Sequence, residues 1–132
     1  MNETLDPESK KALVDYRISR AFETLKEAEL LSKESFFNAA VNRLYYACYY
    51  AAVALLLKND IPAQTHNGVK TMLGLHFVST GKLSAEDGKI FSTLFEKRHS
   101  SDYDDFVYCD KEMIEALTPK AESFIKSIQN LL

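Results

Sequence analysis

Residues 36–57 read FFNAAVNRLYYACYYAAVALLL, and this long apolar run decides the fold. Its length would let a helix cross a membrane. However, Asn38, Asn42 and Arg43 lie in its first third, where polar and charged side chains would be costly in lipid. The run is also rich in alanine and tyrosine rather than leucine and valine. We therefore interpret it as the central, buried helix of a soluble helical bundle, with no membrane span.

Helix-forming patterns flank this run. An N-cap acid followed by proline, Asp6-Pro7, opens a first helix that should reach about Ser32. We expect Ser35 to cap the second helix, which should run to about Lys58 before the sequence Asn-Asp-Ile-Pro at 59–62 breaks it. Apolar residues of the first helix recur at spacings of three and four, which predicts one buried face: Val14, Ile18, Ala21, Leu25 and Ala28.

A third, shorter helix is predicted after the break. Thr65 is placed to cap it, and Gly81 suits the left-handed position that ends a helix. Its apolar stripe has helical spacing: Val69, Met72, Leu73, His76 and Phe77. On this pattern we expect His76 to be a hydrogen-bonded core histidine.

Two more helices complete the chain. Ser84 and Asp87 resemble a capping box that opens a helix leading to Arg98, and we expect this helix to fray into a loop from Asp102 to Tyr108. Asp110 can cap the last helix. Its apolar face stays in phase through Pro119, which predicts one helix kinked at proline rather than two helices: Ile114, Leu117, Ala121, Phe124, Ile128 and Leu131.

Length and composition fit a single helical domain. The chain has 132 residues, and we assign 1–132 to one domain with one core. The scarcity of glycine (4) and proline (3) argues against a β-sandwich. No alternating run is long enough to predict a strand. The predicted fold class is all-α: an up-and-down four-helix bundle with an extra short helix.

Charge and cysteine usage narrow the function classes. The net charge of -3 lacks the strongly basic character of most nucleic-acid binders, although a local basic patch stays open. Cys48 lies in the apolar run and is predicted to be a packed free thiol, and nothing resembles a disulfide framework. The first residues have neither a basic region nor an apolar region of a signal peptide, so we expect a cytoplasmic protein.

A polar stretch interrupts the apolar face of the fourth helix. The apolar part of that face consists of Ile90, Phe91, Leu94 and Phe95. The next positions on the same face are Arg98 and Asp102, which are neighbours on a helix because they are four residues apart. One interpretation is a partly buried ion pair that fixes helix register. The other is a binding site in which Arg98 holds a phosphate or carboxylate by its planar fork, and either Asp102 orients Arg98 or Tyr103 hydrogen-bonds the ligand.

Several segments, taken in order, resemble the HEPN domain family, in particular its small stand-alone prokaryotic branch. The similar segments span roughly residues 10 to 130: Asn42–Ala47, Thr65–Val69, Phe77–Leu83, Arg98 and Asp102–Tyr103. The resemblance implies an up-and-down helical bundle that forms a homodimer, with the polar cluster of the fourth helix near the subunit interface. It also implies a minimal nucleotidyltransferase as a partner in a toxin–antitoxin pair.

Active members of that family are metal-independent ribonucleases whose signature is an arginine followed, after four to six residues, by a histidine. Arg98 matches the arginine, but the expected histidine positions hold Tyr103, Asp104 and Asp105. His99 is adjacent to Arg98 and points about 100° away on a helix, so it does not replace the missing residue. The chain therefore resembles the family in fold and site location, and its enzymatic activity stays open.

Other polar side chains are weaker candidates. His66 either contacts a ligand beside the helix N–H groups or packs on a neighbouring helix. Arg43 is a further ligand-binding candidate that could reach Asp102 or Asp105 from the second helix. A zinc site has no supporting ligand spacing in His66, His76, His99 and Cys109, so we expect no metal and no cofactor. Four tyrosines are predicted to serve core and dimer interface: Tyr45, Tyr46, Tyr49 and Tyr50.

Three functions follow from these observations. The first is a dimer that binds a nucleotide or a partner nucleotidyltransferase through residues 98–103. The second is a metal-independent ribonuclease toxin with a variant catalytic site formed by Arg98, Asp102 and Tyr103. RNA cleavage normally needs an acid and a base with pKa values near neutral, which these residue types do not supply. The third is a non-catalytic helical adaptor.

Overall fold

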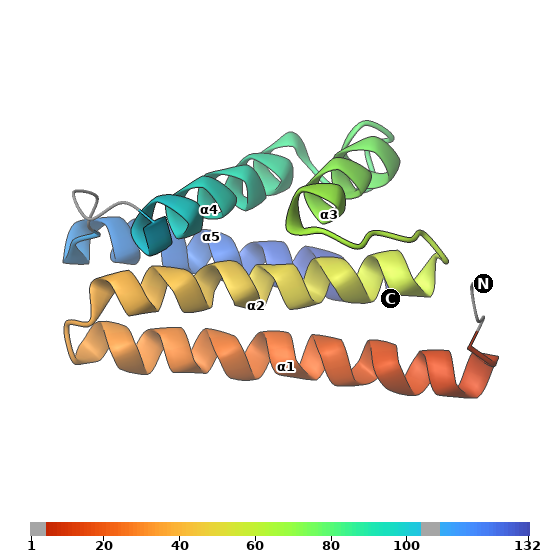
Figure 1. Cartoon of the computed structure of the whole chain (residues 1–132), viewed down its shortest axis with the longest axis horizontal. Helices are drawn as coiled ribbons and strands as arrows, with labels where there is room; N and C mark the ends of the chain where they lie inside the picture. Colours follow the sequence, from red (N-terminus) through yellow and green to blue (C-terminus); the bar gives the residue numbers. More distant parts are fainter. Residues whose placement is uncertain (1–4, 104–108) are drawn as a thin grey trace.

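The chain forms a bundle of helices. A computed structural model describes residues 5–103 and 109–132, and the side chains of all of these except 99–103. The elements are α1 (Pro7–Lys33), α2 (Phe37–Lys58), α3 (His66–Leu73), the π-helical η1 (Gly74–Val78), α4 (Ala85–Tyr103) and α5 (Lys111–Gln129). Figure 1 shows α1 and α2 lying antiparallel and side by side, with α3 and α4 above α2. The predicted all-α class is confirmed.

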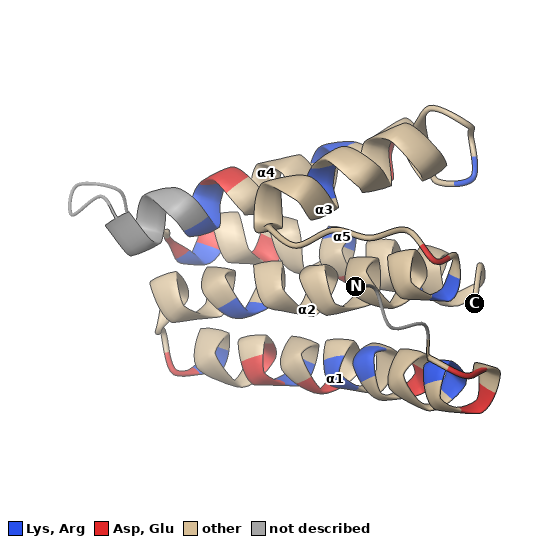
Figure 2. Ribbon diagram, turned by 45° about the vertical axis from the view of Figure 1, so that its right-hand side comes forward, with Lys and Arg blue, Asp and Glu red and all other residues tan. Residues whose placement is uncertain are grey.

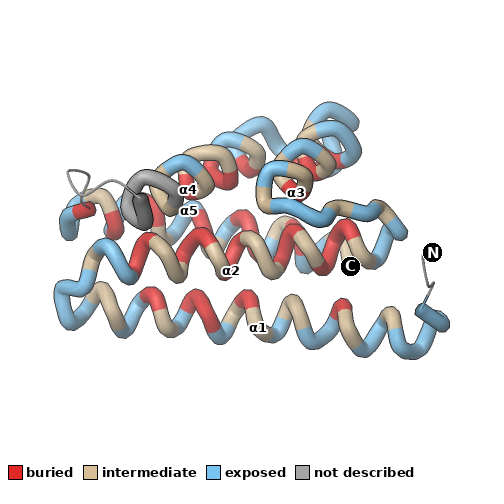
Figure 3. Tube along the Cα trace, in the orientation of Figure 1, coloured by how far each residue is buried: buried red, intermediate tan, exposed pale blue. Residues whose placement is uncertain are grey.

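Helix α2 is the centre of the bundle, as the apolar run predicts. It packs against α1, α3, α4 and α5, and Figure 3 shows buried positions along most of its length. Among the described residues it is the one helix long and apolar enough to cross a membrane, and 61% of its apolar window is buried inside the bundle. Burial against the other helices therefore accounts for its apolar character.

Local capping sets most helix ends where the sequence predicts them. The Asp6 carboxylate accepts the N–H of Ser9 at 2.9 Å, and the Asp110 carboxylate accepts the N–H of Met113 at 2.9 Å. Each contact satisfies one N–H group of a first helical turn. Thr65 caps α3 in the same way. The capping box of α4 is formed by Ser84 and Asp87.

The prediction that Ser35 caps α2 is wrong. Ser35 has a φ of 64° and serves the end of α1, where its N–H and that of Phe36 bond back to the carbonyls of Ser32 and Leu31. This pair of hydrogen bonds forms the Schellman motif. The connection between α1 and α2 is only three residues long, so Ser35 is used to reverse the chain. Phe36 occupies the N-cap of α2 without a side-chain hydrogen bond.

The prediction that His76 lies in the core is also wrong, because His76 is exposed. Val69, Leu73 and Phe77 are buried as expected, but residues 74–78 adopt a π-helical turn. A π-turn bonds i to i+5 and so shifts the phase of a helical stripe. Gly81 ends this segment with a φ of +80°, as predicted.

Helix α5 passes through Pro119 as a single helix, and its predicted face is buried except for Leu131, which follows the helix and is half-buried. Phe124 stacks on Phe91 of α4, with ring centroids 5.5 Å apart. Cys48 and Cys109 are buried free thiols. Helix α4 extends through Asp102 and Tyr103, so the predicted fraying does not begin at Asp102. The rest of the predicted loop, residues 104–108, lies outside the described residues.

Candidate functional site

Aromatic rings from α2 surround the first residue of α3. Tyr45, Tyr46 and Tyr49 lie at i, i+1 and i+4, a spacing that brings their rings to neighbouring positions on a helix. The ring of His66 lies 4.4 Å from that of Tyr49, nearly parallel to it, and meets the ring of Tyr46 edge-on at 5.8 Å. We call His66 and these three tyrosines the tyrosine–histidine cluster.

A hydrogen bond fixes the imidazole within the cluster. The Tyr45 hydroxyl lies 2.8 Å from Nδ1 of His66. Tyr45 is fully buried, whereas His66 is half-buried. The expectation that His66 packs on a neighbouring helix is therefore confirmed, and its role toward a ligand stays a prediction.

Arg98 of α4 joins the cluster from above α2. Its guanidinium carbon lies 5.3 Å from the ring centre of Tyr45 and 5.9 Å from that of Tyr46. These are cation–π distances. Arg98 and His66 therefore rest against the same two rings, although they are 32 residues apart in the sequence.

Burial and the charge of Arg98 set the protonation of the cluster. Burial raises the pKa of Tyr45 well above its ordinary value, an effect that the nearby Arg98 partly opposes. Burial also lowers the pKa of His66 below 6.5, and the positive charge of Arg98 lowers it further. Both side chains are consequently neutral at pH 7.

Arg43 lies at the edge of the cluster. Its guanidinium carbon is 5.0 Å from the ring centre of Tyr46, and its Nη1 lies 3.8 Å from a carboxylate oxygen of Glu27 on α1. Three predicted ligand-binding residues, Arg98, His66 and Arg43, therefore gather around Tyr46. The side chains of Asp102 and Tyr103 lie outside the described residues, so the Arg98–Asp102 ion pair and the contacts of Arg43 with Asp102 or Asp105 stay predictions.

Comparison with known proteins identifies the family. The HEPN domain model matches residues 14–131. The chain belongs to the HEPN family. It is 37% identical over 123 residues to a "UPF0332 protein" of Thermotoga maritima, with 93% of each chain covered. It also resembles two proteins of Methanocaldococcus jannaschii. "Putative toxin MJ0142" is 31% identical and "Putative toxin MJ0605" 33%, covering 87% of this chain and 78% and 85% of theirs.

The sequence predicts that the tyrosines of this HEPN chain serve core and interface, but it does not predict their contacts with the site. Tyr45 is indeed core, and Tyr46, Tyr49 and Tyr50 are half-buried. Arg17 of α1 was also missed, although its charge acts on the hydroxyl of Tyr49. The i, i+1, i+4 spacing of the tyrosines was the available signal, but it does not say which helix packs over them.

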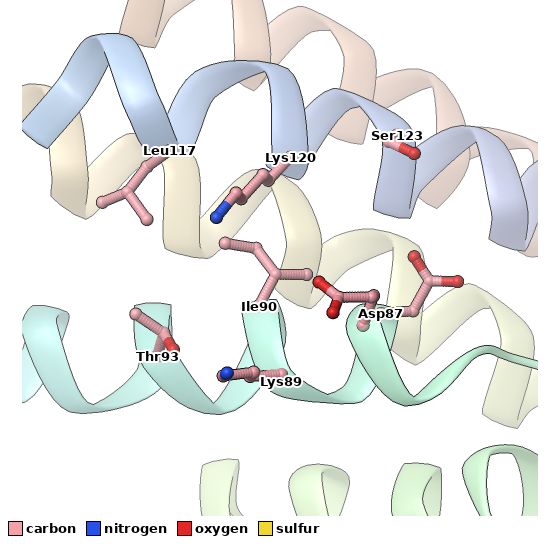
Figure 4. A pocket seen from close by; sticks show the side chains of 8 residues that line it. Asp87, Lys89, Ile90, Thr93, Leu117, Lys120 and Ser123 are labelled. Atoms are coloured by element: carbon pink, nitrogen blue, oxygen red, sulfur yellow. The ribbon is translucent and has the colours of Figure 1, made fainter.

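A separate pocket of about 250 Å³ lies between α4 and α5. Figure 4 shows Asp87, Lys89 and Ile90 on one side and Leu117 and Lys120 on the other. No predicted site residue lines it, and the Asp87 carboxylate is used by the helix cap. Within the described ranges no cluster of histidine, cysteine or acidic residues could hold a metal ion. The tyrosine–histidine cluster with Arg98 is the candidate site of this HEPN domain.

Proposed function

We propose that this HEPN domain is the toxin-type member of a two-component pair. It acts as a homodimer and binds a nucleotide, or a nucleotidyltransferase partner, through Arg98 and the tyrosine–histidine cluster. The observation that carries the proposal is the guanidinium of Arg98 resting on two tyrosine rings beside a neutral imidazole. The two archaeal relatives with toxin in their names support the functional class.

The residue types suit a nucleotide. A guanidinium binds phosphate through paired N–H groups, which gives direction as well as charge. A half-buried tyrosine such as Tyr46 offers a face on which a base can stack, and such stacking does not depend on base identity. The overall charge of -3 makes a long polyanion a poor ligand, so a short or single nucleotide is the better fit.

The homodimer is supported by the outer face of α2. This helix carries only two charged residues, Arg43 and Lys58, whereas charges of both signs cover α1 (Figure 2). Tyr46, Tyr49 and Tyr50 are half-buried in the single chain. Tyrosine and arginine are enriched at the centres of protein interfaces. A second copy that covers these rings would also enclose the candidate site.

Calorimetric titration tests this function. We expect AMP or ATP, or a purified minimal nucleotidyltransferase from the same genome, to bind the wild-type protein, and Arg98→Ala to weaken binding by about tenfold or more. Arg20→Ala is the matched control. Arg20 also lies over a tyrosine, Tyr50 at 5.7 Å, but it pairs with Glu23 at 3.1 Å and lies outside the cluster. Equal affinity of Arg98→Ala and wild type would refute the site.

The second candidate is a metal-independent ribonuclease toxin. The observation in its favour is His66, an imidazole that shares two tyrosine rings with Arg98 although it comes from α3. For this reaction, His66 would have to accept the proton of a ribose 2′-hydroxyl through Nε2. Incubation of total RNA with the purified protein and EDTA, beside Arg98→Ala, tests it. Intact RNA in the wild-type sample, and normal growth of cells that express it, would exclude this candidate.

A further inference from the structure

We propose that His66 binds the ligand's phosphate as a neutral hydrogen-bond donor through its Nε2–H, with Tyr45 as the positioning residue that fixes this tautomer. The inference rests on the proposed nucleotide site at Arg98. It assigns the ligand contact to a specific ring nitrogen, and it distinguishes a binding imidazole from a catalytic base.

The tautomer follows from the burial of Tyr45. A hydroxyl group with no access to water needs an acceptor for its proton. Tyr45 has 0% of its surface exposed, and Nδ1 of His66 lies 2.8 Å from its hydroxyl. The phenol also keeps its proton, because burial raises its pKa. If Nδ1 carried a proton instead, the hydroxyl proton of Tyr45 would lose this acceptor. The phenol therefore donates to Nδ1, and the proton of the neutral ring is on Nε2.

Packing then holds the ring in one orientation. His66 is stacked against Tyr49, with 21° between the ring planes and 4.4 Å between centroids. The ring of Tyr46 meets it at 88°. Since Nδ1 is turned toward buried Tyr45, Nε2 is the ring nitrogen left to contact a ligand. His66 is only partly buried, so a ligand can approach it.

Electrostatics favour a neutral donor at this place. Burial and the charge of Arg98 both lower the pKa of His66, so a second positive charge near the guanidinium is disfavoured. An anion that reaches both groups would receive charge from Arg98 and a directed N–H from His66. His66 is also the first residue of α3, where the helix dipole favours negative charge. The ligand class is therefore a nucleoside monophosphate or a terminal phosphate of a short oligonucleotide.

The tautomer can be tested without a ligand. Long-range ¹⁵N–¹H spectra of the imidazole distinguish a bare ring nitrogen from a protonated one. We expect His66 at pH 7 to show a bare Nδ1 and a protonated Nε2, and Tyr45→Phe to show a mixture of both tautomers. A protonated Nδ1 in the wild-type protein would overturn the proposal, whatever the binding data show.

The ligand contact is tested by titration with AMP, and with inorganic phosphate as the minimal probe. We expect His66→Ala to weaken AMP binding by about tenfold, as for loss of a hydrogen bond to a charged group. His66→Gln should restore most of this loss, because its amide can accept from Tyr45 and donate to phosphate, whereas it cannot act as a base. Circular dichroism and thermal unfolding of both variants control for folding.

The outcomes separate the two proposals. If the wild-type protein does not bind AMP, the proposed nucleotide site fails and the phosphate contact fails with it. If AMP binds and Arg98→Ala loses it while His66→Ala does not, only the role of His66 is overturned. If the wild type cleaves RNA and His66→Gln abolishes cleavage, His66 is a base and the neutral-donor proposal is wrong.

Discussion

Tyr45→Phe should destabilise the protein by a small and defined amount. The substitution removes one hydroxyl from a fully buried ring and changes no packing volume otherwise. The lost interaction is the neutral 2.8 Å hydrogen bond to His66 Nδ1. Such a bond contributes about 0.5–1.5 kcal/mol net, and His66 is exposed enough for water to replace the donor in part. We therefore expect the unfolding free energy to fall by about 1 kcal/mol.

The assays are urea unfolding and thermal unfolding at pH 7, both monitored by circular dichroism. For a domain of this size, a loss of about 1 kcal/mol in unfolding free energy corresponds to a fall in Tm of about 3–5 °C. Tyr49→Phe is the matched control, because it keeps the ring that stacks on His66 and removes a hydroxyl that is not bonded to the imidazole. We expect it to change the unfolding free energy by less than about 0.5 kcal/mol.

The comparison of the two variants tests whether the Tyr45–His66 hydrogen bond stabilises the cluster. If Tyr45→Phe is as stable as wild type, or if both variants lose equal stability, the Tyr45–His66 bond does not hold the cluster together. The argument for a fixed imidazole tautomer would then lose its structural basis.

Three further predictions concern helix ends, glycines and a buried thiol. Gly74→Ala should raise the unfolding free energy by about 0.5–1 kcal/mol, because Gly74 is helical and has open space around it. Gly88→Ala should not raise it, because the added Cβ would lie 3.1 Å from a side-chain carbon of Val78. Asp110→Ala should cost about 1 kcal/mol in urea unfolding by removing the cap of α5. Burial raises the pKa of Cys48. As the pH rises, the thiol therefore loses its proton in the unfolded chain before it does so in the folded protein. The unfolding free energy should consequently fall above about pH 8.5, more steeply than in Cys48→Ala. A wild-type stability that does not change between about pH 8 and 10, or unchanged stability of Asp110→Ala or Gly74→Ala, would contradict the corresponding argument.

Helix ends were predictable where a side chain bonds to its own first turn. The caps at Asp6, Thr65 and Asp110 depend on residues three positions apart, so the sequence contains both partners. The errors at Ser35 and His76 have a different origin. Ser35 ends one helix because the next begins at once, and His76 leaves the core because a π-turn shifts its phase. Neither cause can be read from side-chain type alone.

The candidate site was predicted in its parts but not as a unit. Arg98, His66 and Arg43 were each recognised as ligand-binding candidates from charge and from family resemblance. The sequence predicts only a core and interface role for their common partner, the tyrosine face of α2. Only the placement of α3 and α4 above α2 brings His66 and Arg98 to the ring of Tyr46, where Arg43 of α2 also lies.

The sequence by itself determined the helical class, the central place of residues 36–57 and most helix starts, because these depend on composition, periodicity and contacts within a few residues. The tertiary structure alone decided that Tyr45 would bury its hydroxyl against His66, and that burial and Arg98 would lower the pKa of that imidazole. Both effects require residues from three helices to meet away from water. Periodicity predicts which face of each helix is buried, but not which neighbour that face will meet.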